Sequence, residues 1–234
     1  DCRVAVDFVV NANPVVNLGG PFVQCSGTVT LDAGIFGGSN FSEGFDAGTS
    51  QVTYTPAGGW VQQNNSVPGT TQWFGGNTAT FASHSGAGYI AANFNNTSGT
   101  NTISNWLLTP TISLQNGDVF SFWTRTVNAP AFPDRLQVRM STSGVSSNVG
   151  TTATDLGDFT NLLLDINPTL TTAGYPTAWT QYTVTISGLS GPTSGRLAFR
   201  YFVTGAGPSG ANSDYIGIDD VTYVSSVPSY TYAW

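Results

Sequence analysis

The sequence predicts an all-β protein, built as a jelly-roll β-sandwich with an N-terminal β-strand extension. Two observations lead to this prediction. Short apolar or alternating segments recur from Phe41 onward, and clusters of Gly, Asn, Pro and Ser separate them at close spacing. Many short strands with turn signals between them are typical of sandwiches and jelly rolls. Only residues 158–165 are compatible with a helix, and we read them as a strand or a single helical turn.

Ten segments have the β-forming residues or the alternation of a strand. They are residues 59–63, 78–82, 88–94, 105–108, 112–114, 119–126, 135–141, 180–186, 196–203 and 215–223. Trp106 and Trp123 lie within apolar strands of this set, so both are expected in the core.

Changes in composition divide the chain into three parts. Residues 1–38 are predicted to be an N-terminal strand extension, residues 39–224 the jelly-roll β-sandwich, and residues 225–234 an extended C-terminal tail. A Gly-rich stretch marks the first boundary, as linkers often do.

The N-terminal extension has one strongly apolar face. Val4, Val6, Phe8 and Val10 alternate along its first strand. Residues 1–38 contain too few strands for a core of their own, and a small isolated β-ribbon is marginally stable in water. We therefore expect this part to dock on the main domain or on another molecule.

Composition and charge exclude some classes of function. The chain of 234 residues has 8% charged residues, no lysine and a formal net charge of −7. Six arginines cannot form the basic face that a nucleic-acid-binding protein needs, so we expect no nucleic-acid partner. No apolar run approaches twenty residues, so no membrane span is expected.

The N-terminus indicates a secreted protein. The chain begins Asp1-Cys2 and its only methionine is Met140, which favours a mature chain from which a signal peptide was removed. In an oxidising compartment Cys2 and Cys25 are predicted to form a disulfide, with a stabilisation of about 3 kcal/mol. We expect an extracellular or cell-surface location.

Two adjacent carboxylates, Asp219 and Asp220, interrupt the apolar strand 215–223. In a jelly roll the first and last strands commonly lie side by side, which would bring Glu43 and Asp46 close to them. Clustered carboxylates repel one another unless a cation neutralises them, and Ca²⁺ prefers such oxygen ligands. The sequence predicts a Ca²⁺ site formed by Glu43, Asp46, Asp219 and Asp220. Alternatively, one Asp accepts bonds from backbone N–H groups or an Arg while the other is solvated.

The residues required for common catalytic sites are scarce. His84 is the only histidine, it lies in a Ser/Gly-rich turn, and no Gly-x-Ser-x-Gly motif surrounds any serine. Glu43 is the only glutamate, and no motif pairs it with an aspartate as glycoside hydrolysis requires. A zinc site is not supported either. We expect no enzymatic activity.

Three aromatic residues occur in loop-like context and are predicted to contact a ligand or partner, such as a glycan or a host surface. These residues are Trp73, Phe74 and Tyr175. They support an alternative function, a carbohydrate-binding module that uses loop aromatics.

Several motifs, in order, resemble one known family. They are Gly44-Phe45-Asp46, Gly59-Trp60, Gly88-Tyr89-Ile90-Ala91-Ala92, Asn105-Trp106-Leu107-Leu108-Thr109-Pro110, Phe120-Ser121-Phe122-Trp123, Asp134-Arg135-Leu136-Gln137-Val138 and Asp214-Tyr215-Ile216-Gly217-Ile218-Asp219-Asp220-Val221. Over about residues 40–224 the chain resembles the bacterial choice-of-anchor J domain, which is related to cleaved-adhesin domains. The resemblance implies a MAM-like jelly roll that is secreted or surface-held, without catalysis. It also implies structural Ca²⁺, with Asp46 and Asp219 as the favoured ligands. The N-terminal segment is similar to the start of a PKD-like repeat.

A truncated half-domain with apolar strands has the properties of a donor strand. Adding a strand to a neighbour's open sheet provides main-chain hydrogen bonds and side-chain pockets, and repetition of such a contact gives a filament. The absence of lysine, which often guards sheet edges, fits deliberate edge pairing. The sequence therefore predicts a non-catalytic, adhesin-like surface or matrix protein that self-assembles into an extracellular filament, with copies of itself as partners.

Overall fold

The structure is a computed structural model that describes residues 39–48 and 53–226. The chain divides into two units, Asp1–Phe36 and Gly37–Trp234, and all the described residues belong to the second. Several predictions lie outside the described residues. They are the strand extension with its face of Val4, Val6, Phe8 and Val10, the disulfide between Cys2 and Cys25, and the tail from residue 227 onward.

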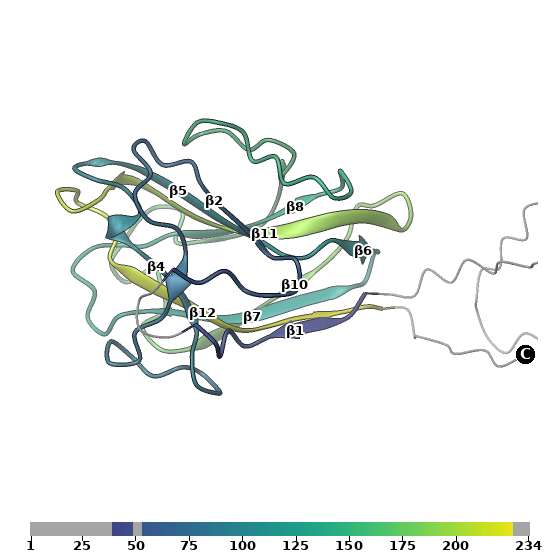
Figure 1. Cartoon of the computed structure of the whole chain (residues 1–234), viewed down its shortest axis with the longest axis horizontal. Coiled ribbons are helices and arrows are strands. Elements are labelled where there is room, and N and C mark those ends of the chain that lie inside the picture. Colours follow the sequence, from purple (N-terminus) through teal and green to yellow (C-terminus); the bar gives the residue numbers. More distant parts are fainter. Residues whose placement is uncertain (1–38, 49–52, 227–234) are drawn as a thin grey trace, which may run out of the picture. The chain divides into compact units, whose positions relative to one another are not determined.

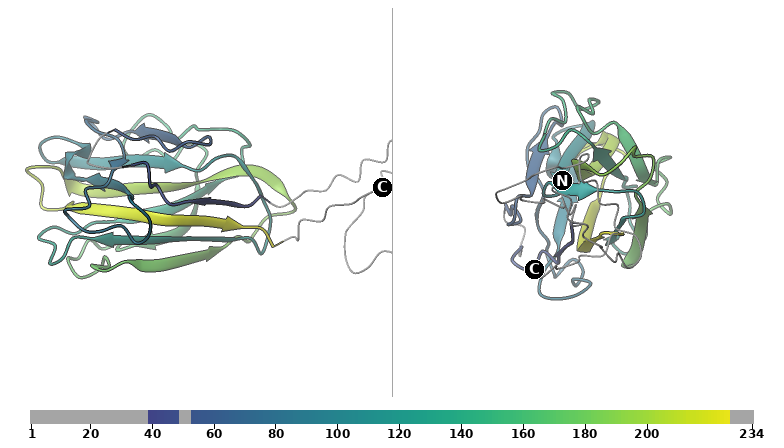
Figure 2. Two further views of the ribbon diagram at one scale, coloured as in Figure 1. Left: turned by 60° about the horizontal axis from the view of Figure 1, so that its bottom comes forward. Right: turned by 90° about the vertical axis from the view of Figure 1, so that its right-hand side faces the viewer.

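Two six-stranded sheets, antiparallel throughout, face each other in the described part of the chain (Figures 1 and 2). The order of the first sheet is β10 (Thr180–Thr185), β7 (Val119–Thr126), β12 (Tyr215–Val224), β4 (Ile90–Asn93) and β3 (Phe74–Gly75), and β1 (Phe41–Glu43) also pairs with β12.

The second sheet runs from β2 to β9. Its order is β2 (Val61–Asn64), β5 (Asn101–Leu108), β11 (Thr193–Ala206), β8 (Leu136–Ser141) and β9 (Asn161–Ile166), and β6 (Ile112–Leu114) also pairs with β11. The single helical element among the described residues is the short 3-10 turn η1 (Phe94–Asn96). The predicted fold class, an all-β jelly-roll-like sandwich, is confirmed.

The main core lies between the sheets, because successive side chains of a strand point to opposite faces. In β7, Phe120 and Phe122 point inward and meet Phe199 of β11, with ring centroids 5.5 and 4.8 Å away. All three rings are almost fully buried. Burying each such side chain contributes roughly 1.5–3 kcal/mol, so the facing rings hold the two sheets together.

The same alternation corrects one prediction about the core. Trp123 follows Phe122 and therefore points to the outer face of the first sheet, where it is only half-buried. Trp106 is fully buried, although it too lies on an outer face: it packs with Val149 and Phe159 of a covering loop. Apolar strand context alone does not distinguish these two situations.

The predicted strand at residues 78–82 is wrong. This segment forms turns, because Asn77 accepts hydrogen bonds from the backbone N–H groups of Ala79 and Thr80. Residues 158–165, left open between strand and helical turn, contribute strand β9. The short strands β1 and β3 are present although the sequence did not predict them.

Within the part of the chain that the structure describes, no helix has the length and apolar character needed to cross a membrane.

Candidate functional site: the carboxylate cluster of the closing strand

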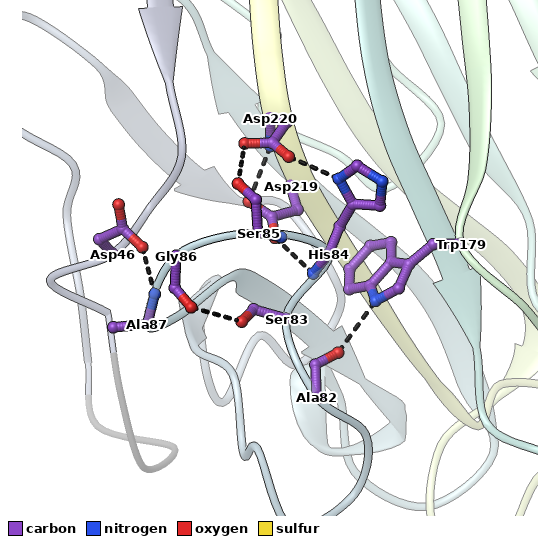
Figure 3. A network of polar contacts seen from close by, with 10 residues as sticks. All are labelled: Asp46, Ala82, Ser83, His84, Ser85, Gly86, Ala87, Trp179, Asp219 and Asp220. Carbon is purple, nitrogen blue, oxygen red and sulfur yellow. Dashed lines mark hydrogen bonds and ion pairs between the residues drawn. The ribbon is translucent and has the colours of Figure 1, made fainter.

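The closing strand β12 is irregular at its two aspartates. Its pairing with β7 shifts register between Asp219 and Thr222, and Asp220 has a positive φ of 46°. On its other side, β12 pairs with β1, which places Glu43 opposite Val221. The prediction that the first and last strands of the sandwich are neighbours is confirmed. The bulge turns the carboxylates of both Asp219 and Asp220 toward the loop formed by residues 83–87 (Figure 3).

Asp219 is fully buried and accepts backbone hydrogen bonds at both carboxylate oxygens. Oδ1 accepts from the N–H of Asp220 at 2.7 Å, and Oδ2 accepts from the N–H groups of His84 at 2.8 Å and Ser85 at 3.3 Å. Burial raises the pKa of Asp219 to about 6, the charge of Asp220 adds to the rise, and the N–H donors oppose it. The alternative interpretation, an aspartate bonded to backbone N–H groups, therefore describes Asp219.

Asp220 is partly exposed and binds side chains of the same loop. Its Oδ2 lies 2.5 Å from Nδ1 of His84, and its Oδ1 accepts a hydrogen bond from Oγ of Ser85 at 2.7 Å. The His84 ring also stacks on Trp123, with centroids 3.8 Å apart. The histidine is therefore held between a carboxylate and an indole ring.

The arrangement around His84 does not form a nucleophilic relay. Ser83 donates its hydroxyl hydrogen to the carbonyl of Gly86, and Ser85 donates to Asp220. Neither hydroxyl is hydrogen-bonded to the imidazole, so the geometry that activates a serine is not formed at this loop.

Asp46 holds the other end of the loop. Its Oδ1 accepts a hydrogen bond from the N–H of Ala87 at 2.5 Å. Gly86 has a φ of 57°, and a Cβ there would lie 1.9 Å from this same oxygen. A Cβ at Gly88 would lie 2.7 Å from the carbonyl oxygen of Gly48. The loop can therefore approach the turn after β1 only because both positions are glycine.

Three of the four predicted calcium ligands thus gather around one loop. Oxygens of Asp46 and Asp220 lie 3.4 and 3.6 Å from the position that a Cβ would take at Gly44. The fourth, Glu43, uses Oε1 to accept a hydrogen bond from the N–H of Phe45 at 2.8 Å, within its own turn. Carboxylate oxygens match the chemistry of Ca²⁺. However, among the described residues no three Asp, Glu, His or Cys side chains are arranged so that they could hold a metal ion.

The predicted contact aromatics are not at the surface, so this prediction is wrong. Trp73, Phe74 and Tyr175 are 0%, 7% and 2% exposed. Trp73 belongs to the main core, and Phe74 lies in β3, packed against Tyr215. The Tyr175 hydroxyl is hydrogen-bonded to the Thr124 hydroxyl inside the protein.

The half-exposed rings on this face come from other residues. They are His84, Trp123 and Trp179, and the Trp179 indole donates a hydrogen bond to the Ala82 carbonyl. The alternation of β7 was the one signal that could have placed Trp123 here. Nothing local in the sequence indicates that His84 meets a residue 136 positions away.

Two antiparallel sheets that face each other, closed by the bulged last strand β12, define this molecule as a jelly-roll-like β-sandwich. A family model described as Cleaved Adhesin Domain matches residues 42–223, and the chain belongs to this family. The resemblance drawn from the sequence motifs is thereby confirmed.

Solved structures agree with the family assignment. The K1 cleaved adhesin domain of Lys-gingipain from Porphyromonas gingivalis is 25% identical, covers 81% of this chain and 100% of its own, and has a TM-score of 0.55. The K3 domain of the same protein is 24% identical with the same coverage and a TM-score of 0.53. Among curated proteins there is no match.

Proposed function

We propose that this protein is a non-catalytic, adhesin-like component of an extracellular or cell-surface structure. The observation that carries the proposal is the family match, which spans nearly the whole described sandwich. The contacts of His84 support it, because the only imidazole of the chain is engaged by Asp220 and Trp123. These contacts stabilise a loop and leave the ring without a serine to activate.

The proposed mode of action is self-assembly by strand donation. Residues 1–38 would supply the donor, with Val4, Val6, Phe8 and Val10 as its buried face. The composition supports this idea, because only 8% of the residues are charged and lysine is absent. Sheet edges without such charges are poorly protected against pairing with another strand.

Electron microscopy of the full chain tests self-assembly. We expect filaments from the unaltered protein, and monodisperse particles from the double variant Val6→Asp, Phe8→Asp, because two buried carboxylates would prevent docking of the donor face. The matched control Val67→Asp, at an exposed valine of the described domain, should still form filaments. Monodisperse unaltered protein at every concentration would refute self-assembly. Saturable binding on a glycan array by such particles would favour a carbohydrate-binding module instead.

We also propose that Ca²⁺ stabilises the carboxylate cluster. Asp46 and Asp220 would bind the ion, since oxygens of both approach Gly44, while Asp219 holds the loop in place and Glu43 lies in the adjacent turn. The ion would neutralise the carboxylate charges that otherwise repel one another.

Thermal unfolding tests the calcium proposal. With Ca²⁺ at a hundred times its Kd, we expect a stabilisation of about 2.7 kcal/mol and a Tm about 5–10 °C higher than in chelator. The double variant Asp46→Asn, Asp220→Asn should lose this difference. The control Asp155→Asn should keep it, because Asp155 accepts hydrogen bonds from Thr151 and Thr152 in a separate loop. An identical Tm with Ca²⁺ and with chelator would remove calcium from the proposed function.

A further inference from the structure

One side of the sandwich is left open by two edge strands. β9 is the last strand of the second sheet, and β10 is the last strand of the first. In residues 39–48 and 53–226, no further strand pairs with the outer edge of either. Each edge therefore presents backbone N–H and C=O groups to which an additional strand can bind.

Apolar residues lie on this side of the sandwich, most of them in β9. β9 carries three consecutive leucines, of which Leu162 is 48% exposed. Leu163 and Leu164 are half-buried and pack against the main core, as do Tyr182 of β10 and Leu189 after it. The main core is thus covered only in part between these two edges, which leaves apolar surface for an incoming side chain to bury.

A groove of about 630 Å³ opens at the end of this side. Residues 160–163 form one wall and residues 187–191 the other, and Met140 contributes from β8. No Asp, Glu, Lys, Arg or His lines the groove. Most of the lining side chains are polar but uncharged, and Met140, Leu162, Leu163 and Leu189 add apolar surface, so an uncharged extended peptide fits the groove better than a charged ligand.

The N-terminal part of the chain enters the described domain near this groove. The N–H of Ser113 in β6 donates to the hydroxyl of Ser39. Three residues further on, Asn116 exchanges hydrogen bonds with the backbone of Leu189, which lies in the groove wall. The 38 residues that precede Ser39 therefore start from the end of the domain that carries the groove.

We propose that the edge of β9 and this groove form the acceptor for residues 3–10 of a second copy of the chain. The proposal rests on the self-assembly proposed above and names its docking site. Antiparallel pairing of residues 3–10 with β9 would place Val4, Val6, Phe8 and Val10 on the face toward Leu163, Leu164 and Tyr182. The eight-residue donor is long enough to cover the six residues of β9.

The linker is long enough for the donor to reach a neighbouring copy. Residues 11–38 can span roughly 90 Å when extended, at about 3.3 Å per residue. That reach allows the donor to extend to a neighbouring copy, which is the occupant that the self-assembly proposal requires. Each copy then carries one donor segment and one acceptor. Such a heterologous contact, when it does not close into a ring, gives an open filament.

Photo-cross-linking of the full chain tests the acceptor. A photoreactive phenylalanine derivative replaces Phe8, and isotopically heavy and light copies are mixed before irradiation. Mass spectrometry should find heavy-to-light cross-links from position 8 to residues 160–164 or 187–191. Cross-links to any other region, cross-links confined to one copy, or no cross-links would each overturn the proposal.

A pair of matched variants adds a readout in the assembled state. Leu162→Glu places a charge on the β9 edge at an exposed position, so the fold should be retained. The Leu162→Glu variant should need at least a tenfold higher protein concentration for assembly. Val67→Glu, at a 61% exposed valine that follows β2 at the opposite edge of the same sheet, should leave the concentration needed for assembly unchanged. Equal effects of the two variants would contradict the acceptor site.

The two proposals fail in different ways. Filaments whose cross-links from position 8 lie outside the acceptor would refute the acceptor and leave self-assembly intact. Heavy-to-light cross-links at the acceptor, in a protein that forms no filaments under the microscope, would support the acceptor and refute filament formation.

Discussion

Replacing Asp219 with alanine is expected to lower the free energy of unfolding by about 2–3 kcal/mol at pH 7. The carboxylate accepts hydrogen bonds from three backbone N–H groups, and a buried donor left without a partner costs roughly 1–3 kcal/mol. Two effects make the expected loss smaller than the sum of the costs of these three N–H groups. Burial raises the pKa of Asp219 to about 6, so removing the charged group relieves a desolvation cost, and water can reach part of the loop.

Denaturant unfolding in the presence of a chelator measures this change in the free energy of unfolding separately from any effect of calcium. Asp46→Asn is the matched control, because Asp46 is exposed and accepts one backbone hydrogen bond, from Ala87. We expect it to cost less than 1 kcal/mol. Trp123 gives a second readout: loosening the loop moves His84 away from the indole and should change its fluorescence. Equal losses for the two variants would show that Asp219 does not organise the loop.

Asp134 is expected to make the protein less stable as the pH rises from about 4 to about 6. Burial raises the pKa of this carboxyl from 3.8 to about 6, against the hydrogen bonds from Tyr201, Asp214 and Thr126. The folded state therefore binds a proton in this range that the unfolded state has released. The free energy of unfolding then falls with pH, and a shift of this size corresponds to about 3 kcal/mol. The loss is complete above about pH 6.

The hydrogen bonds around Asp134 give a structural reason for the bound proton. The Thr126 hydroxyl lies within hydrogen-bonding distance of both Oδ2 of Asp134 and the carbonyl of Tyr215. A hydroxyl has one hydrogen and cannot donate to both acceptors. A protonated Asp134 resolves the conflict, because it can donate to Thr126 while Thr126 donates to Tyr215.

The variant Asp134→Asn tests this explanation. Its amide can donate to Thr126 at every pH and its oxygen can still accept from Tyr201. We expect wild-type stability near pH 4 and greater stability than the wild type at pH 7. Unfolding measured from pH 4 to 7 should show a smaller slope, and adding Asp219→Asn should reduce it further. A slope unchanged by Asp134→Asn would show that this carboxyl is not the titrating group.

The sequence alone determined the strand content and the order of motifs. Period-two patterns and turn residues identified most strands, including the closing strand with Asp219 and Asp220, and the motifs from Gly44 to Val221 identified the family. These features are local, because β-propensity and turn chemistry act over a few neighbouring residues. The expectation that the first and last strands are neighbours came instead from the jelly-roll architecture, and β1 does pair with β12.

Only the tertiary structure decided which face of each strand is buried in the core and which groups bind the carboxylate oxygens. Alternation shows that Phe122 and Trp123 point to opposite sides of β7, but the packing of the other sheet determines that Phe122 is the core residue. Likewise, two of the three N–H groups that bind Asp219 belong to a loop about 135 residues earlier in the chain. Backbone N–H groups occur in every sequence, so only the fold reveals which carboxylate they surround.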